Sequence, residues 1–173
     1  MRFSHLPPTQ ESVAMREPNG EDSGPAALAT HLDRVLADGE RLIALIPGAH
    51  MDYASRTSGR PVRDIAYQMF RQSLAFVDAL DRGHLVLSWL EEKAPHDLDD
   101  GRAIARYGAL VRGRLAGWFE GAGPGEYSRE IRVDRGTEAA RNLLERTTRQ
   151  ATEHLEQLRA VIRELGLTPT DIT

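Results

Sequence analysis

Four segments of this chain carry apolar residues at the spacing of an amphipathic helix, and this periodicity constrains the fold more than any other feature. In residues 25–46 the apolar side chains recur three or four positions apart, and residues 61–82, 101–120 and 137–165 repeat the pattern. A helix with one apolar face must bury that face against another element. Four such helices with no convincing sheet predict an all-α four-helix bundle.

Residues typical of helix ends flank these segments. Proline is favoured in the first turn of a helix, glycine just past its end, and Asp, Ser or Thr at the N-cap. We therefore expect Thr137 to cap the last helix and Gly166 to follow its end. The other signals are Ser23 and Pro25 at the first helix, Pro47-Gly48 at its end, Gly83 after the second helix, and Asp99 or Asp100 before the third.

Two of the connections between helices are long. Residues 84–98 contain a short apolar patch and a proline, and predict one or two helical turns and a loop. Further on, Tyr127, Arg129, Ile131 and Val133 alternate with polar neighbours, which indicates a short extended ribbon. Connections of this length allow crossovers instead of a strict up-and-down order of helices.

The length of 173 residues suits one domain. Residues 1–24 are polar, contain several prolines and glycines and lack periodicity, so we expect a disordered or loosely docked N-terminal arm. The bundle then occupies residues 25–167, and residues 168–173 form a C-terminal tail.

Composition excludes several classes of function. The chain has no cysteine, which removes disulfides, thiolate nucleophiles and cysteine-ligated metal centres. A net charge of −4 argues against a nucleic-acid partner, and no apolar run approaches the ~20 residues of a membrane span. Phosphate-loop, dinucleotide and G-x-S-x-G motifs are absent, as is a secretory signal, so we expect a cytoplasmic location.

A polar pair interrupts the apolar stripe of the last helix. Gln150 and His154 are four residues apart and therefore lie on one face, beside Ala151 and Leu155. A buried polar group without a partner costs ~1–3 kcal/mol, so this pair needs partners. It is either a hydrogen-bonded core histidine or part of a functional site. Gln68, at the edge of the second stripe, is by itself a boundary glutamine that wets one end of the bundle.

Several segments together resemble the DinB/YfiT-like superfamily. The stretch 62–71, VRDIAYQMFR, and residues 74–80 are similar to the second helix of those proteins. The third helix is matched by IARYG at 104–108 and LAGW at 115–118, and LERTT at 144–148 leads into the last helix. The resemblance spans residues 28–165.

This resemblance implies a bundle that forms a metal cup. Family members take one histidine from the second helix and an H-x-x-x-H pair from the last, and three imidazoles hold zinc, nickel or iron with positions left open. Many resemble S-transferases that use thiols such as bacillithiol or mycothiol. Others are isomerases or hydrolases, and dimers are common, so a homodimer is expected.

The chain departs from that pattern at two of the three positions. They hold Gln68, Gln150 and His154, and a glutamine amide is a weaker ligand than an imidazole. We therefore expect no metal cofactor, although weak binding of Zn, Ni or Fe stays open. The same three residues could form the polar floor of a pocket for a small molecule, with His154 as the acid or base.

Four further residues are candidates for binding at the pocket rim: Tyr67, Arg71, Tyr107 and Arg149. Trp118 is a fifth, although both it and Tyr107 are also typical of a core. Arg71 follows Gln68 by one turn and could face an anionic substrate, or else be a solvated arginine. Arg149 has the alternative of pairing with glutamates four residues away on either side.

Three functions follow from these expectations. The first is a non-metal DinB-like protein that binds, and perhaps transforms, a small molecule with His154 as acid or base, in a specialised biosynthetic pathway. The second is a metal-dependent thiol S-transferase, and the third is a catalytically silent bundle for dimerisation or protein binding.

Overall fold

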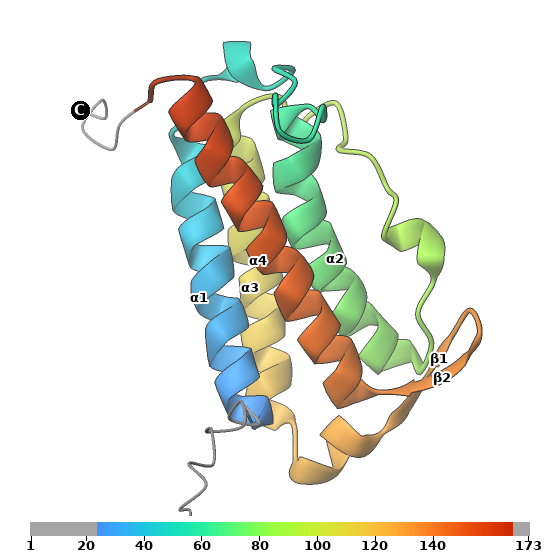
Figure 1. Cartoon of the computed structure of the whole chain (residues 1–173). Coiled ribbons are helices and arrows are strands. Elements are labelled where there is room, and N and C mark those ends of the chain that lie inside the picture. Colours follow the sequence, from blue (N-terminus) through green and yellow to red (C-terminus); the bar gives the residue numbers. More distant parts are fainter. Residues whose placement is uncertain (1–23, 168–173) are drawn as a thin grey trace, which may run out of the picture.

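The computed structural model describes residues 24–167, which form four long helices joined by shorter elements (Figure 1). The N-terminal arm and the C-terminal tail expected from the sequence lie outside the described residues, Gly24 excepted. The helices are α1 (Pro25–Ala44), α2 (Val62–Arg82), α3 (Gly101–Gly121) and α4 (Ala140–Glu164). Between them lie the 3-10 turns η1 (Gly48–His50), η2 (Leu87–Trp89) and η3 (Pro124–Ser128), and the strands β1 (Glu130–Val133) and β2 (Gly136–Ala139).

The helices do not follow one another around the bundle. α1 and α2 each pack against both α3 and α4, and they make few contacts with each other. In Figure 1, α1 and α4 run upward while α2 and α3 run downward, so residues 83–100 climb the length of the bundle between α2 and α3. This arrangement confirms the four-helix bundle with a long crossover connection.

Most of the predicted helix ends are confirmed. Pro25 opens α1, and Asp100 caps α3 by accepting a hydrogen bond from the Ala103 backbone N–H at 2.6 Å. Gly83 ends α2 with a φ of 73°, a left-handed conformation that favours glycine. α1 ends at Ala44, before the predicted Pro47-Gly48 signal.

The predicted cap of the last helix is wrong. Thr137 lies in β2 opposite Arg132, and α4 begins only at Ala140. The reason is a hairpin between residues 130 and 139, whose ladder uses the backbone around Thr137. The predicted ribbon is confirmed for residues 130–133, whereas Tyr127 lies in η3.

The core fills the space between the apolar faces of all four helices. Among its fully buried side chains, Phe70 and Phe76 of α2 are the largest. Phe76 and Trp118 meet edge to face, with ring centroids 5.7 Å apart, and Tyr127 closes this end of the bundle against Trp118. No helix of the described chain is long and apolar enough to cross a membrane.

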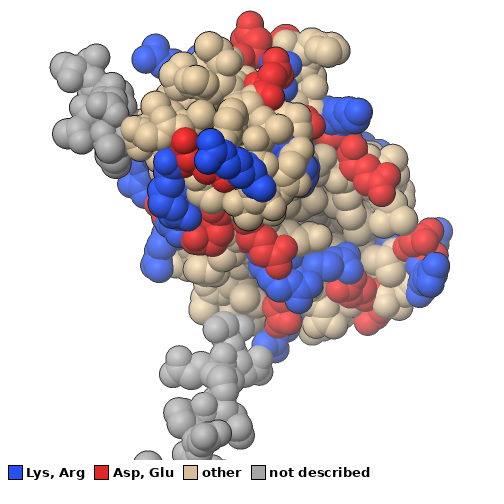
Figure 2. All heavy atoms as spheres, turned by 45° about the horizontal axis from the view of Figure 1, so that its top comes forward, with Lys and Arg blue, Asp and Glu red and all other residues tan. Residues whose placement is uncertain are grey.

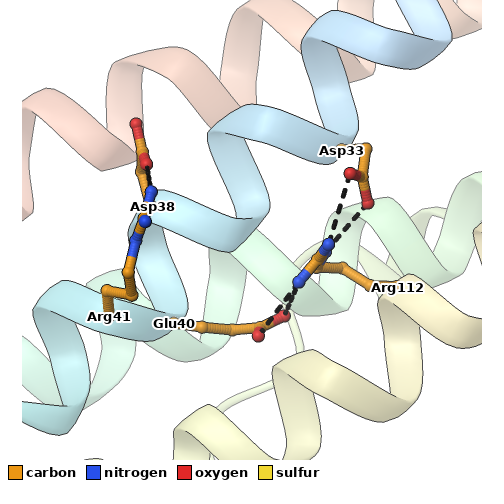
Figure 3. A network of polar contacts seen from close by, with 5 residues as sticks. All are labelled: Asp33, Asp38, Glu40, Arg41 and Arg112. Atoms are coloured by element: carbon orange, nitrogen blue, oxygen red, sulfur yellow. Dashed lines mark hydrogen bonds and ion pairs between the residues drawn. The ribbon is translucent and has the colours of Figure 1, made fainter.

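A charged cluster at the surface links α1 to α3 (Figure 3). Arg112 of α3 donates to Asp33 at 2.9 Å and to Glu40 at 3.3 Å, both on α1, and Asp38 pairs with Arg41 one turn along. Burial raises the pKa of Glu40, and the charge of Arg112 acts in the opposite direction. Partly exposed pairs of this kind contribute little individually, so the apolar core supplies most of the stability.

Gly101→Ala tests the close approach of α3 to α1. A Cβ at Gly101 would overlap the Ile43 carbonyl oxygen and lie 2.8 Å from that of Ile46, and backbone atoms cannot rotate away. We expect a loss of about 2 kcal/mol or more in the free energy of unfolding, measured by urea denaturation. The control is Gly113→Ala on the same helix, where a Cβ meets nothing within 4 Å. It should leave stability unchanged or raise it, and an equal loss in both variants would contradict the close packing.

Candidate functional site

His154 is a buried histidine with one ring nitrogen in use and one free. Its residue is 7% exposed on the inner face of α4. Nδ1 lies 2.7 Å from the backbone carbonyl of Gln150, and a carbonyl can only accept, so Nδ1 carries the proton. In the neutral ring, Nε2 then has a lone pair, and this buried atom has no hydrogen-bond partner among the residues that the structure describes. The geometry therefore presents His154 as a proton acceptor.

The surroundings of His154 favour its neutral form. Burial lowers the pKa of the imidazole below its ordinary value of 6.5, and the positive charge of Arg60 lowers it further. The hydrogen bond to Gln150 and the charge of Glu153 act in the opposite direction and are smaller than the effect of burial. At neutral pH the ring is an uncharged base.

Gln68 is buried on α2 and is hydrogen bonded at both ends of its amide. Its Nε2 donates to the backbone carbonyl of Glu92 at 2.5 Å, and its Oε1 accepts from Gln72 Nε2 at 3.3 Å. The Glu92 carbonyl fixes the orientation of Gln68, which in turn fixes that of Gln72. As a result Gln72 Oε1 is left as a buried acceptor with no partner in the described part of the chain.

A cavity of about 350 Å³ opens beside these glutamines. One wall is the face of α2 with the residue that precedes it, and the other is the connection between α2 and α3. The lining residues are Arg60, Asp64, Gln68, Gln72, Leu90, Glu91 and Lys93. Of the residues singled out in the sequence, Gln68 lines this cavity, whereas His154 does not line it. The charge of Arg60, which does line it, lowers the pKa of His154.

Arg71 is engaged within the chain. Its side chain is 9% exposed, and Nε donates to the Glu92 carboxylate at 2.5 Å. The guanidinium also lies 5.9 Å from the ring centre of Trp89. Arg71 is thus not the solvated arginine that the sequence allowed, and it holds the α2–α3 connection against α2.

The other candidates separate into core and surface. Tyr67 and Tyr107 stack with ring centroids 5.3 Å apart, and burial raises the pKa of both phenols. Trp118 belongs to the aromatic cluster beneath Phe76. Gln150 is half-buried, and Arg149 is exposed on the outer side of α4. The structure therefore brings Gln68 to the cavity lining. The other predicted pocket residues do not line this cavity: His154, Gln150, Tyr67, Arg71, Tyr107, Arg149 and Trp118.

Sequence reasoning missed most of the cavity lining. Asp64 and Gln72 stand at four-residue spacing with Gln68 on α2, a pattern that places residues on one side of a helix, whereas Arg60 precedes the helix. That spacing was the available signal. Nothing in the sequence shows that the α2–α3 connection lies opposite this row.

The residues present do not fit the three-histidine metal centre that the resemblance implies. His154 supplies one imidazole, and both ends of the Gln68 amide are already bonded within the chain. Within residues 24–167, no three His, Cys, Asp or Glu side chains gather in a metal-binding arrangement. A donor set of one imidazole and two amides would hold a soft divalent ion far more weakly than three imidazoles.

Comparison with known proteins identifies the fold. No family model and no curated protein matches the chain. It is similar in structure to a DinB-like protein, YjoA, from Bacillus subtilis, with a TM-score of 0.65 and 18% sequence identity. The match covers 82% of this chain and 93% of that one. The chain therefore has a DinB-like fold, and at this identity the likeness carries no activity with it.

The buried His154 should make stability depend on pH. Its pKa is lower in the folded chain than in the unfolded one, so the unfolded state takes up its proton first. The stability from the neutral ring is complete above pH 6.5 and is lost as the pH falls below 6.5 toward the folded pKa. We expect His154→Gln to lose less unfolding free energy than the wild type between pH 7.5 and 5.5 in urea titrations. Equal losses in the two proteins would contradict the lowered pKa.

Proposed function

We propose that this chain binds a small molecule in the cavity beside α2 and that His154 serves there as a general base, without a metal held by Gln68, Gln150 and His154. The observation that carries the proposal is the buried, unpartnered Nε2 of His154 with its tautomer fixed by the Gln150 carbonyl. A specialised biosynthetic step is the kind of role that suits such a site.

The state of His154 supports this role. A general base must be unprotonated at working pH and must have a lone pair free to receive a proton. Burial keeps the ring neutral at pH 7, and the bond at Nδ1 orients it. A histidine retained only for packing would be expected to use both nitrogens, because an unmet buried polar atom is unfavourable.

The cavity supports binding over a silent bundle. Its volume of about 350 Å³ is within the range of small-molecule sites, near the lower end. Amide and charged groups line it, together with the apolar Leu90. Arg60 connects cavity and base, since it lines the first and lowers the pKa of the second.

A ligand screen tests the proposal directly. We expect ligand-observed NMR with a diverse metabolite library at pH 7.5 to find binders whose signals respond to substitutions in the cavity wall. For a compound that is converted, His154→Gln should lower turnover by about 100-fold or more and leave affinity within about tenfold, because a general base contributes 10²–10⁴ in rate. His31→Gln, which removes an exposed histidine of α1, is the matched control. A folded His154→Gln protein with full turnover would refute the base.

Metal loading tests the part of the proposal that concerns the three ligand positions. After incubation with Zn, Ni or Fe(II) and desalting, we expect the wild type to retain far less than one equivalent by elemental analysis. The Gln68→His/Gln150→His double variant should retain close to one equivalent of zinc, because it restores the three imidazoles of the metal centre that the resemblance implies. Stoichiometric metal in the wild type would instead favour the thiol S-transferase. A double variant that stays metal-free would show that these positions do not converge.

A further inference from the structure

The cavity wall on α2 presents polar groups in a fixed order. Asp64, Gln68 and Gln72 follow one another at four-residue spacing, so each step advances ~6 Å along the helix axis. Arg60 continues the row just before the helix begins at Val62. A ligand along this wall meets first a cation, then an anion, then two amides.

The charges of the cavity have no partners among residues 24–167. Within the described residues, the side chains of Arg60, Asp64, Glu91 and Lys93 form no ion pair or hydrogen bond. Arg60 and Asp64 are both half-buried, which makes an unpaired charge more costly than it is at the surface. The two line one cavity without approaching within the 4.0 Å of an ion pair, so opposite charges are held apart there.

Neighbouring arginines of the same helix behave differently. Arg63 pairs with Asp52 at 3.2 Å, and Arg71 pairs with Glu92 at 2.5 Å. Arg63 and Arg71 of α2, outside the cavity lining, are therefore paired, whereas the charged residues of the lining form no ion pair among the described residues. At the end of the bundle turned forward in Figure 2, acidic and basic side chains are interspersed, with no large field of one sign. A ligand of a single strong charge, such as a polyanion, matches neither the cavity nor this surface.

The amide end of the row also has a defined polarity. The Glu92 carbonyl accepts from Gln68, and Gln68 accepts from Gln72, so the free end of the Gln72 amide is its oxygen Oε1. An amide oxygen can only accept a hydrogen bond. Beyond its two charges, the ligand therefore offers hydrogen-bond donors, such as an amide N–H or a hydroxyl.

We infer that the cavity binds a zwitterion of amino-acid or dipeptide size, an inference that rests on the proposed function. Its carboxylate pairs with Arg60, its ammonium pairs with Asp64, and a donor further along it bonds to Gln72 Oε1. Lys93 and Glu91 on the opposite wall add a second charge of each sign, and Leu90 offers an apolar contact for a side chain. The volume of about 350 Å³ suits a ligand of this size.

The experiment separates the two charges of the ligand. The common L-amino acids and their glycyl dipeptides are titrated into the full chain by isothermal calorimetry. Each binder is compared with its C-terminal amide, which lacks the carboxylate, and its N-acetyl form, which lacks the ammonium. We expect each change to weaken binding by about tenfold or more, because each removes one charge-assisted contact.

Two variants assign each charge to its residue. Arg60→Gln should abolish the preference for the free carboxylate, and Asp64→Asn should abolish the preference for the free ammonium. The controls are Arg56→Gln and Asp52→Asn, which make the same charge changes at exposed residues outside the cavity lining. Circular dichroism confirms that all four variants are folded.

The outcomes distinguish this inference from the proposed function. If binders keep their affinity as amide and N-acetyl forms, or if Arg60→Gln and Asp64→Asn behave like the controls, the zwitterion is overturned. The same follows if other metabolites bind the cavity and no amino acid or dipeptide does. If no small molecule of any class binds the chain, the proposed function fails as well.

Discussion

The anchoring of Glu92 to α2 is the contact on which the candidate site depends. Its backbone carbonyl accepts from Gln68, and its carboxylate accepts from Arg71, so one residue of the long α2–α3 connection is bound to two successive turns of the helix. This places Leu90, Glu91 and Lys93 opposite the row of polar residues on α2 and creates the cavity between them. The same carbonyl sets the direction of the two glutamine amides. The connection exists because α2 and α3 run parallel, and the chain must therefore return the full length of the bundle (Figure 1).

The sequence predicted the features that depend on neighbouring turns of a single helix, namely the positions of the helices and some of their ends. The spacing of apolar residues located all four helices, and Asp100 and Gly83 marked two of their ends. Thr137 failed as a cap because its environment depends on a hairpin partner, and a pairing between strands is not written in local propensity. The spacing of Gln150 and His154 placed both on one face of α4. The free Nε2 of His154 could not be predicted, because it depends on whether the described part of the other helices places a hydrogen-bond donor beside it.

The role of Arg71 shows the same limit at the site. Its position one turn beyond Gln68 suggested either an anion-binding residue or a solvated one. The structure gives it a third role, since it forms an ion pair with Glu92, more than twenty residues away in sequence. Arg60 was not predicted as a site residue, because it precedes the helix in a polar loop and belongs to no helical pattern. Which of two arginines is free to meet a ligand is thus decided by the course of the connection.

In the proposed function, Arg60 also couples the binding of a ligand to the chemistry of the base. Its positive charge adds to burial in lowering the pKa of His154. A carboxylate bound to Arg60 offsets that charge, and the Coulombic part of the effect is reduced while the hydrogen bond between Nδ1 and the Gln150 carbonyl is untouched. The imidazole then becomes more basic when the cavity is occupied than when it is empty. Because His154 starts below its ordinary pKa, a rise brings it closer to neutral pH, where a general base transfers protons most effectively. A site built in this way keeps its base uncharged before the ligand arrives and strengthens it on binding.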